Sequence, residues 1–176
     1  MSKAKRRSNA EIVRSTLSDA GIHVESADKD DPNDSEAISV SYEDGENSWV
    51  TYLFPDEDVS LVRLYSTFNF DTDRFDRGRL LEAVNYLNYR MLLDTHIEFN
   101  PIIKRLRLRE NILDSSPVVN PIQFMEAFQE HEFSVGVWLQ VMRGVLESNK
   151  PVDDATTDAF TKIVGNNTER SAAVTD

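Results

Sequence analysis

Three arginines at alternate positions are the side chains whose type and spacing could do chemistry in this sequence. Arg105, Arg107 and Arg109 are separated by Leu106 and Leu108. Because residues two apart lie on the same face of a β-strand, the spacing predicts a strand with leucines on one face and three guanidinium groups on the other. Guanidinium groups bind carboxylate and phosphate oxygens through paired hydrogen bonds. These three arginines are therefore the candidate interaction strip.

Two interpretations of this arginine strip are open. Like charges two residues apart on one strand face repel, so the strip needs acidic neighbours or an anionic partner. In the first interpretation, carboxylates on adjacent strands neutralise the arginines, which guard a sheet edge against pairing with another sheet. The chain holds 31 Asp and Glu against 19 Lys and Arg, which favours this interpretation. In the second, the strip binds an acidic protein segment or a phosphate group.

Two asparagines form the second candidate contact. Asn85 and Asn88 are three residues apart on an expected helix, so they lie on adjacent parts of one helix face. A partly buried amide needs hydrogen-bond partners. We expect polar contacts at the rim of the packing between helix and sheet, with direct contact to a partner as the alternative.

Other side chains that commonly do chemistry are few or poorly placed. The chain has no Cys, which excludes thiol nucleophiles, iron–sulfur clusters and the common structural zinc sites. His96 and His131 are far apart in the sequence, without a carboxylate at the spacing of metal ligands, so structural histidines are expected. Neither a Gly-x-Ser-x-Gly elbow nor a Gly-rich phosphate loop occurs. The sequence predicts no catalytic residue, no metal site and no cofactor.

The charge of the chain bears on its partners. The formal net charge of −12 opposes approach to nucleic-acid phosphates, although the basic start of the chain and the arginine strip could contact them. Acidic residues are dense from Glu25 to Asp58, where we expect a solvated acidic face, with weak cation binding as the alternative. No apolar run approaches the 18 or so residues that a membrane span requires. A cytoplasmic protein without membrane or nucleic-acid partners is expected.

Apolar spacing predicts a helix and then a strand meander in the first half of the chain. The helix begins with Asn9 as its cap and ends at Gly21. Residues 38–43 alternate between apolar and polar, and Asp44–Gly45 supplies hairpin turn residues before the strand at 49–54. A further strand is expected at 59–68. Whether 22–25 also forms a short strand is left open.

The second half predicts helices separated by two strands. A helix begins at Thr72 or Asp73, with its apolar stripe ending at Met91. Asn120 caps a later helix whose first residue is Pro121, and this helix either continues to Leu146 or breaks between His131 and Gly136. The two strands are expected around 97–99 and at 102–109, followed by a loop at 111–119. A short helix around 159–163 is left as an alternative.

This element order, α-β-β-β-α-β-β-α, predicts an α+β fold. Strands that occur in blocks, without a helix between each pair, favour an antiparallel sheet with helices packed on it. The expected organisation is a disordered basic arm at 1–8, a single domain at 9–148 and a polar tail at 149–176.

At this point the pattern resembles the YbjN-like family, whose members are described as regulators of bacterial sensory transduction and share the type III secretion chaperone-like fold. Three features carry the resemblance: the first helix ending in Gly21, the segment Leu80–Asn88, which is similar to that family's L-x-x-x-N-x-x-N helix, and the segment Ile122–Phe128. It covers approximately residues 9 to 147. The acidic segment 28–36, the arginine strip and the tail after Lys150 depart from the family pattern.

The resemblance implies a small, acidic, often dimeric protein that binds other proteins and has no known enzymatic activity. We therefore expect a non-enzymatic protein-interaction domain, either a YbjN-like regulator or a chaperone-like binder, that works as a homodimer. The alternative is a small-ligand sensor or an enzyme whose pocket is assembled from residues distant in the sequence.

Overall fold

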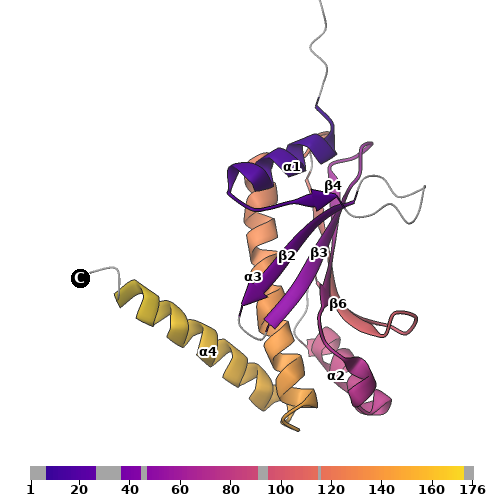
Figure 1. The fold of residues 1–176 in the computed structure, drawn as a ribbon, viewed down its shortest axis with the longest axis vertical. Helices are drawn as coiled ribbons and strands as arrows, with labels where there is room; N and C mark the ends of the chain where they lie inside the picture. Colours follow the sequence, from indigo (N-terminus) through magenta and orange to yellow (C-terminus); the bar gives the residue numbers. More distant parts are fainter. Residues whose placement is uncertain (1–6, 27–36, 45–46, 91–94, 115, 173–176) are drawn as a thin grey trace, which may run out of the picture.

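An antiparallel sheet with helices on one face forms the core of the protein (Figure 1). This computed structural model describes residues 7–26, 37–44, 47–90, 95–114 and 116–172. The elements are α1 (Asn9–Asp19), β1 (Glu25–Ser26), β2 (Ile38–Asp44), β3 (Asn47–Pro55), β4 (Leu61–Phe68), the 3₁₀ turn η1 (Thr72–Arg74), α2 (Arg77–Arg90), β5 (His96–Asn100), β6 (Arg105–Leu113), α3 (Pro121–Leu146) and α4 (Val152–Ala172). The predicted α+β class with an antiparallel sheet is confirmed.

The six strands lie in the order β1-β2-β3-β4-β6-β5, and every neighbouring pair is antiparallel. The β2–β3 hairpin brings Asp44 opposite Asn47, as the predicted hairpin requires, while its turn at 45–46 is outside the described residues. Burial alternates along β3 and β4, so one face of the sheet is buried and the other half-exposed. We call the half-exposed side the outer face.

All the helices that contact the sheet pack on its buried face. The apolar residues of α1, α2 and α3 join those of the strands in two clusters. One cluster includes Leu17, Leu53 and Phe124, and the other includes Leu87 and Leu139. Helix α3 crosses both clusters, and α4 packs against α3 as a further layer (Figure 1). None of the described helices covers the outer face.

Strand β6 begins later than the predicted strand at 102–109. Its first residue is Arg105, because the Asn100 side chain accepts hydrogen bonds from the backbone N–H groups of Ile102 and Ile103 and holds 101–104 as a turn. Lys104 has a φ of 51°, which ends this turn. The strand also continues to Leu113, where the sequence predicted loop from 111. An apolar Ile-Ile pair followed by alternation had suggested one continuous strand.

The ends of α1 and α2 also differ from the prediction. Ser8, and not Asn9, is the N-cap of α1, since its hydroxyl accepts from Glu11 N–H while the Glu11 carboxylate accepts from Ser8 N–H. Ser8 is thus part of the domain, while residues 1–6 of the predicted disordered arm are outside the described residues. Helix α2 begins at Arg77, because 72–74 forms the 3₁₀ turn η1, capped by the Asp71 side chain.

Helix α3 is continuous from Pro121 to Leu146, so the alternative of a break between His131 and Gly136 is wrong. Asn120 caps it as predicted, accepting from two backbone N–H groups of the first turn. In the predicted tail, α4 extends from Val152 to Ala172. It is much longer than the short helix around 159–163 that the sequence left as an alternative. The predicted acidic segment 28–36 and Met91 lie outside the described residues. Among the described helices, none has the length and apolarity of a membrane span.

Candidate functional site

The outer face collects aromatic and cationic side chains from three strands, β3, β4 and β6. Strand pairing places Tyr52 opposite Tyr65, and Tyr65 opposite Arg109. Arg107 lies opposite Thr67 on β4 and opposite Glu98 on β5. All three arginines of the strip lie on this face, while Leu106 and Leu108 are buried on the other, as their spacing predicted.

Of the described carboxylates, Glu98 is the one that contacts two of the three arginines. Its Oε2 lies 2.6 Å from a terminal nitrogen of Arg107 and 2.8 Å from Nε, and its Oε1 lies 3.5 Å from Arg109. Both guanidinium groups also stack over the ring of Tyr65, with Cζ atoms 4.7 and 6.0 Å from its centroid. A cross-strand carboxylate thus accompanies the strip, but β6 is paired on both sides, so its arginines do not guard a sheet edge.

Arg105 lacks such a carboxylate. Its guanidinium group donates to the Asn69 side chain at 3.5 Å and to the Phe70 carbonyl at 3.4 Å, both long and both neutral acceptors. Among the described residues, no ion pair within 4.0 Å involves it. Arg105 lines a hollow of about 310 Å³ to which Val50, Tyr52 and Thr67 also contribute. In the strip, Arg107 and Arg109 therefore share one carboxylate, whereas Arg105 contacts none that the structure describes.

The two predicted asparagines have different positions. Asn88 is half-buried, and its amide donates to the Ile97 carbonyl at 2.8 Å and accepts from the Ile97 N–H at 2.9 Å. It therefore joins α2 to the backbone of β5, which is the contact expected at the rim of the helix packing. Asn85 is exposed on the same helix.

A polar belt crosses the buried face of the sheet between the two apolar clusters. We define it as Thr51, Ser66, Glu110, His131 and Glu132. His131 is fully buried, with Nδ1 2.7 Å from Glu110 Oε2 and Nε2 2.7 Å from Ser66 Oγ. Ser66 Oγ lies 2.7 Å from Thr51 Oγ1, which lies 2.6 Å from Glu132 Oε1. The belt thus joins β3, β4, β6 and α3 through four hydrogen bonds in series.

The protons of the belt can be counted. Four hydrogen bonds in series need four hydrogens, and the two hydroxyls with one ring N–H of a neutral imidazole supply three. One further proton must therefore sit on His131 or on one of the two carboxyl groups for all four bonds to form. Burial raises the pKa of Glu132, against hydrogen bonds from Thr51 and Trp49 Nε1 that lower it.

The order Ser66, His131, Glu110 has the connectivity of a serine nucleophile, its base and an orienting carboxylate. A nucleophile must also reach a substrate. Ser66 is fully buried, and its Oγ is already bonded to Thr51 as well as to His131. None of the hollows described for this structure includes Ser66 or His131 among its lining residues. The arrangement therefore favours a structural belt over a catalytic site.

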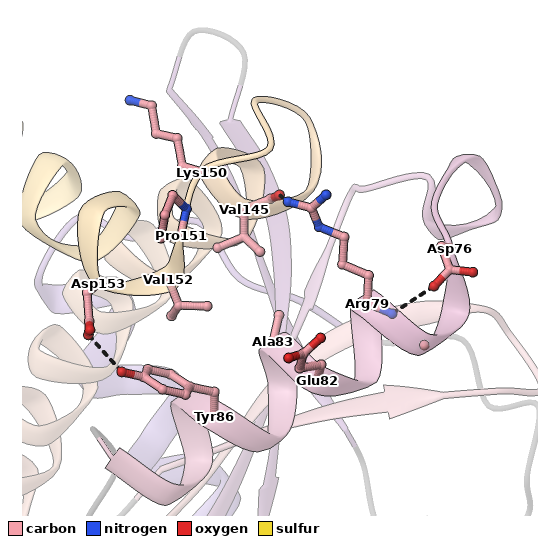
Figure 2. Close-up of a pocket in the computed structure, with 11 residues that line it drawn as sticks. Asp76, Arg79, Glu82, Ala83, Tyr86, Val145, Lys150, Pro151, Val152 and Asp153 are labelled. Atoms are coloured by element: carbon pink, nitrogen blue, oxygen red, sulfur yellow. Dashed lines mark hydrogen bonds between the residues drawn. The ribbon is translucent and has the colours of Figure 1, made fainter.

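The largest groove described lies between α2 and the junction of α3 with α4, with a volume of about 700 Å³ (Figure 2). Its polar groups bind one another across the groove: Tyr86 donates to Asp153 at 2.8 Å, and Arg79 donates to the Val145 carbonyl and to Asn149. These contacts hold α2 against the helix junction. Figure 2 shows Glu82 and Lys150 on the same groove, so its charge is mixed.

Sequence reasoning missed the belt because its members are separated along the chain by up to about 80 positions. His131 and Glu132 lie on the apolar stripe of α3, between Phe128 and Val135, and that position is the one signal available. In the described part of the chain, no group of three or more His, Asp or Glu is arranged to hold a metal ion. Comparison of the whole chain with protein-family models, curated proteins and solved structures finds no match in any of the three.

Proposed function

We propose that this protein is a non-enzymatic interaction domain that binds another protein on the outer face of its sheet. The observation that carries the proposal is the outer face itself, which none of the described helices covers and which presents arginine and tyrosine together. Arg and Tyr are enriched at protein interfaces, because both bury large areas while retaining polar groups. An antiparallel sheet can leave one face to solvent, so exposure alone carries less weight than this composition.

We further propose that the protein is a YbjN-like regulator or chaperone-like binder of the bacterial cytoplasm. Support comes from the α+β class with an antiparallel sheet, although the order of elements differs from the predicted one by β1, η1 and α4. The acidic net charge of −12 suits a protein that keeps an interaction surface in solution.

Affinity capture from the native cell extract tests the interaction function. The full chain serves as bait, beside a variant with Arg105, Arg107 and Arg109 all changed to Glu. Lys162→Glu, an exposed single charge reversal on α4, is the control for a charge reversal away from the outer face. We expect partners that bind wild type and the control and not the triple variant. No specific partner of wild-type protein would contradict the proposal, provided that circular dichroism shows all three proteins folded.

Homodimer formation is a separate part of the proposal. Light scattering at several concentrations is expected to give twice the chain mass of 20.1 kDa. A mass of one chain up to high micromolar concentration would contradict it.

A second candidate function, hydrolysis, rests on the Ser66–His131–Glu110 relay alone. It requires an opening movement that brings Ser66 to solvent, since a buried hydroxyl meets no substrate. Labelling of Ser66 by a serine-directed fluorophosphonate probe would support it.

A further inference from the structure

The charge of the outer face is opposite to that of the whole chain. Arg63, Arg105, Arg107 and Arg109 lie on its central strands, whereas the carboxylates beside them are Glu98 and Asp56, the latter 3.5 Å from Arg63. The chain as a whole has a net charge of −12. At physiological ionic strength the Debye length is about 8 Å, so a group that docks on this face responds to the local arginines more than to distant acidic residues.

The hollow beside Arg105 gives this face a defined anchoring point. Glu43, the other charged residue that lines it, belongs to β2, three strand spacings from β6, or roughly 14 Å away. No ion pair within 4.0 Å joins Glu43 to Arg105 among the described residues. The guanidinium group has long hydrogen bonds to neutral acceptors, while Val50 and Tyr52 supply apolar surface in the same hollow. An incoming carboxylate would give Arg105 the charged acceptor that it lacks.

A second copy of this chain, docked by the same face, fits poorly. A two-fold contact is self-complementary, so the two outer faces would meet each other. The strip of one copy would then approach the strip of the other, and like charges brought together at an interface are repulsive.

Single-stranded nucleic acid also fits poorly. Such ligands are bound largely by bases that stack on aromatic rings. The ring of Tyr65, at the centre of the face, already lies under the guanidinium groups of Arg107 and Arg109.

We propose that the outer face binds an acidic segment of another protein, with one carboxylate on Arg105, another on Arg109, and an apolar side chain in the hollow. Arg109 accepts the second carboxylate because its contact with Glu98 is long, at 3.5 Å, and its side chain is 43% exposed. Arg105 and Arg109 are four residues apart on β6, or about 13 Å, so an extended segment with two acidic residues four positions apart matches them. This inference rests on the proposed interaction function and specifies the chemistry of the partner.

Fluorescence anisotropy with the full chain tests the inference. The probe is a labelled extended peptide with two Glu residues four positions apart and Val on the same face, compared with the same peptide carrying Gln for Glu. We expect the Glu peptide to bind at least about tenfold more tightly, the factor expected for one charge-assisted contact. A short single-stranded oligothymidine is the competing probe, and its tighter binding would overturn the choice of partner.

Two variants change the affinity for the Glu peptide in opposite directions. Arg105→Glu is expected to weaken it about tenfold or more, because the anchor becomes repulsive. Glu98→Gln is expected to strengthen it, because it releases Arg107 and Arg109 from their internal carboxylate. Lys162→Glu is the control for net charge. Equal affinities across the three variants would overturn the proposal, since the peptide would then bind elsewhere.

Cell-extract capture separates failure of this inference from failure of the interaction function. A partner captured equally by wild type and by Arg105→Glu would overturn the assignment of the anchor while the interaction function stands. A partner that is captured specifically yet lacks an acidic segment would overturn the chemistry alone. Absence of any specific partner would contradict the interaction function itself.

Discussion

The imidazole of His131 on α3 lies within 2.7 Å of the Glu110 carboxylate on β6, although 21 positions separate them in the chain. The belt that contains them runs between the two apolar clusters, since each member lies two to four positions from residues of both. Thr51 is flanked by Trp49 and Leu53, which belong to different clusters. Apolar packing accepts many small shifts, whereas a buried hydrogen-bonded belt accepts few. We infer that the belt sets the position of α3 on the sheet.

Replacing His131 by Ala is expected to lower the free energy of unfolding by about 2–4 kcal/mol, because it leaves Ser66 and Glu110 with unpaired buried groups and opens a cavity. Urea denaturation measures the change. His23→Ala, at a side chain that is 86% exposed, is the control and should change stability by less than about 0.5 kcal/mol. Similar effects of the two substitutions would contradict a structural belt.

The raised pKa of Glu132 makes stability depend on pH. Burial raises the pKa of this carboxyl above the ordinary 4.5, so the folded state binds its proton more tightly than the unfolded state. The stabilisation from that proton is complete below pH 4.5 and is lost as the pH rises through the raised folded pKa. As the pH rises from 4.5 through the raised folded pKa, Glu132→Gln should therefore become more stable than wild type, and it should keep this advantage at higher pH. Urea denaturation at several pH values measures the difference, with Glu130→Gln, exposed on the same helix, as the control. A difference that does not change with pH would contradict the prediction.

Ser66→Ala distinguishes a structural hydroxyl from a nucleophile. Loss of the hydroxyl leaves His131 and Thr51 each without one partner, and we expect a loss of about 1–3 kcal/mol in unfolding free energy. Because Ser66 is fully buried, the folded wild-type protein should not react with a fluorophosphonate probe. Labelling of wild type that disappears in Ser66→Ala would instead favour the hydrolase.

Asn88→Ala is expected to weaken the attachment of β5 to α2. The amide satisfies both backbone groups of Ile97, and two such bonds together contribute about 1–3 kcal/mol. Hydrogen exchange at the Ile97 amide should accelerate more than exchange in β3. Asn85→Ala, exposed on the same helix, should leave both exchange and stability nearly unchanged. Equal effects of the two alanines would show that the Ile97 contacts contribute nothing.

The two glycines of α3 are expected to respond oppositely to alanine. A Cβ on Gly144 would lie 2.9 Å from the Cβ of Ala155, so Gly144→Ala must push α4 away from α3. At Gly136 the nearest neighbour is Trp49 at an ordinary 3.7 Å, and alanine there should stabilise the helix by up to about 1 kcal/mol. Thermal denaturation with circular dichroism compares the two variants. Gly144→Ala as stable as Gly136→Ala would contradict the close approach of α4.

Short-range pattern accounts for the elements that the sequence predicted well. The β2–β3 hairpin and the opposite facing of Leu106 and Arg107 follow from a period of two, which is a local property of strand geometry. The Asn120 cap with Pro121 follows from the chemistry of one helix turn. The errors fell at the ends of elements, such as the start of β6, where the Asn100 side chain competes with strand pairing.

Tertiary structure alone decided what surrounds each polar side chain. The period of β6 placed three arginines on one face, but only strand order revealed that β5 brings Glu98 to two of them and leaves Arg105 beside a hollow. His131 had no partner within reach along the chain, and its partners came from β4 and β6. Hydrogen bonds and ion pairs act over a few ångströms, whereas the sequence orders residues only along the chain. The nature of each contact was therefore decided by the order of the strands and by the packing of α3 on the sheet.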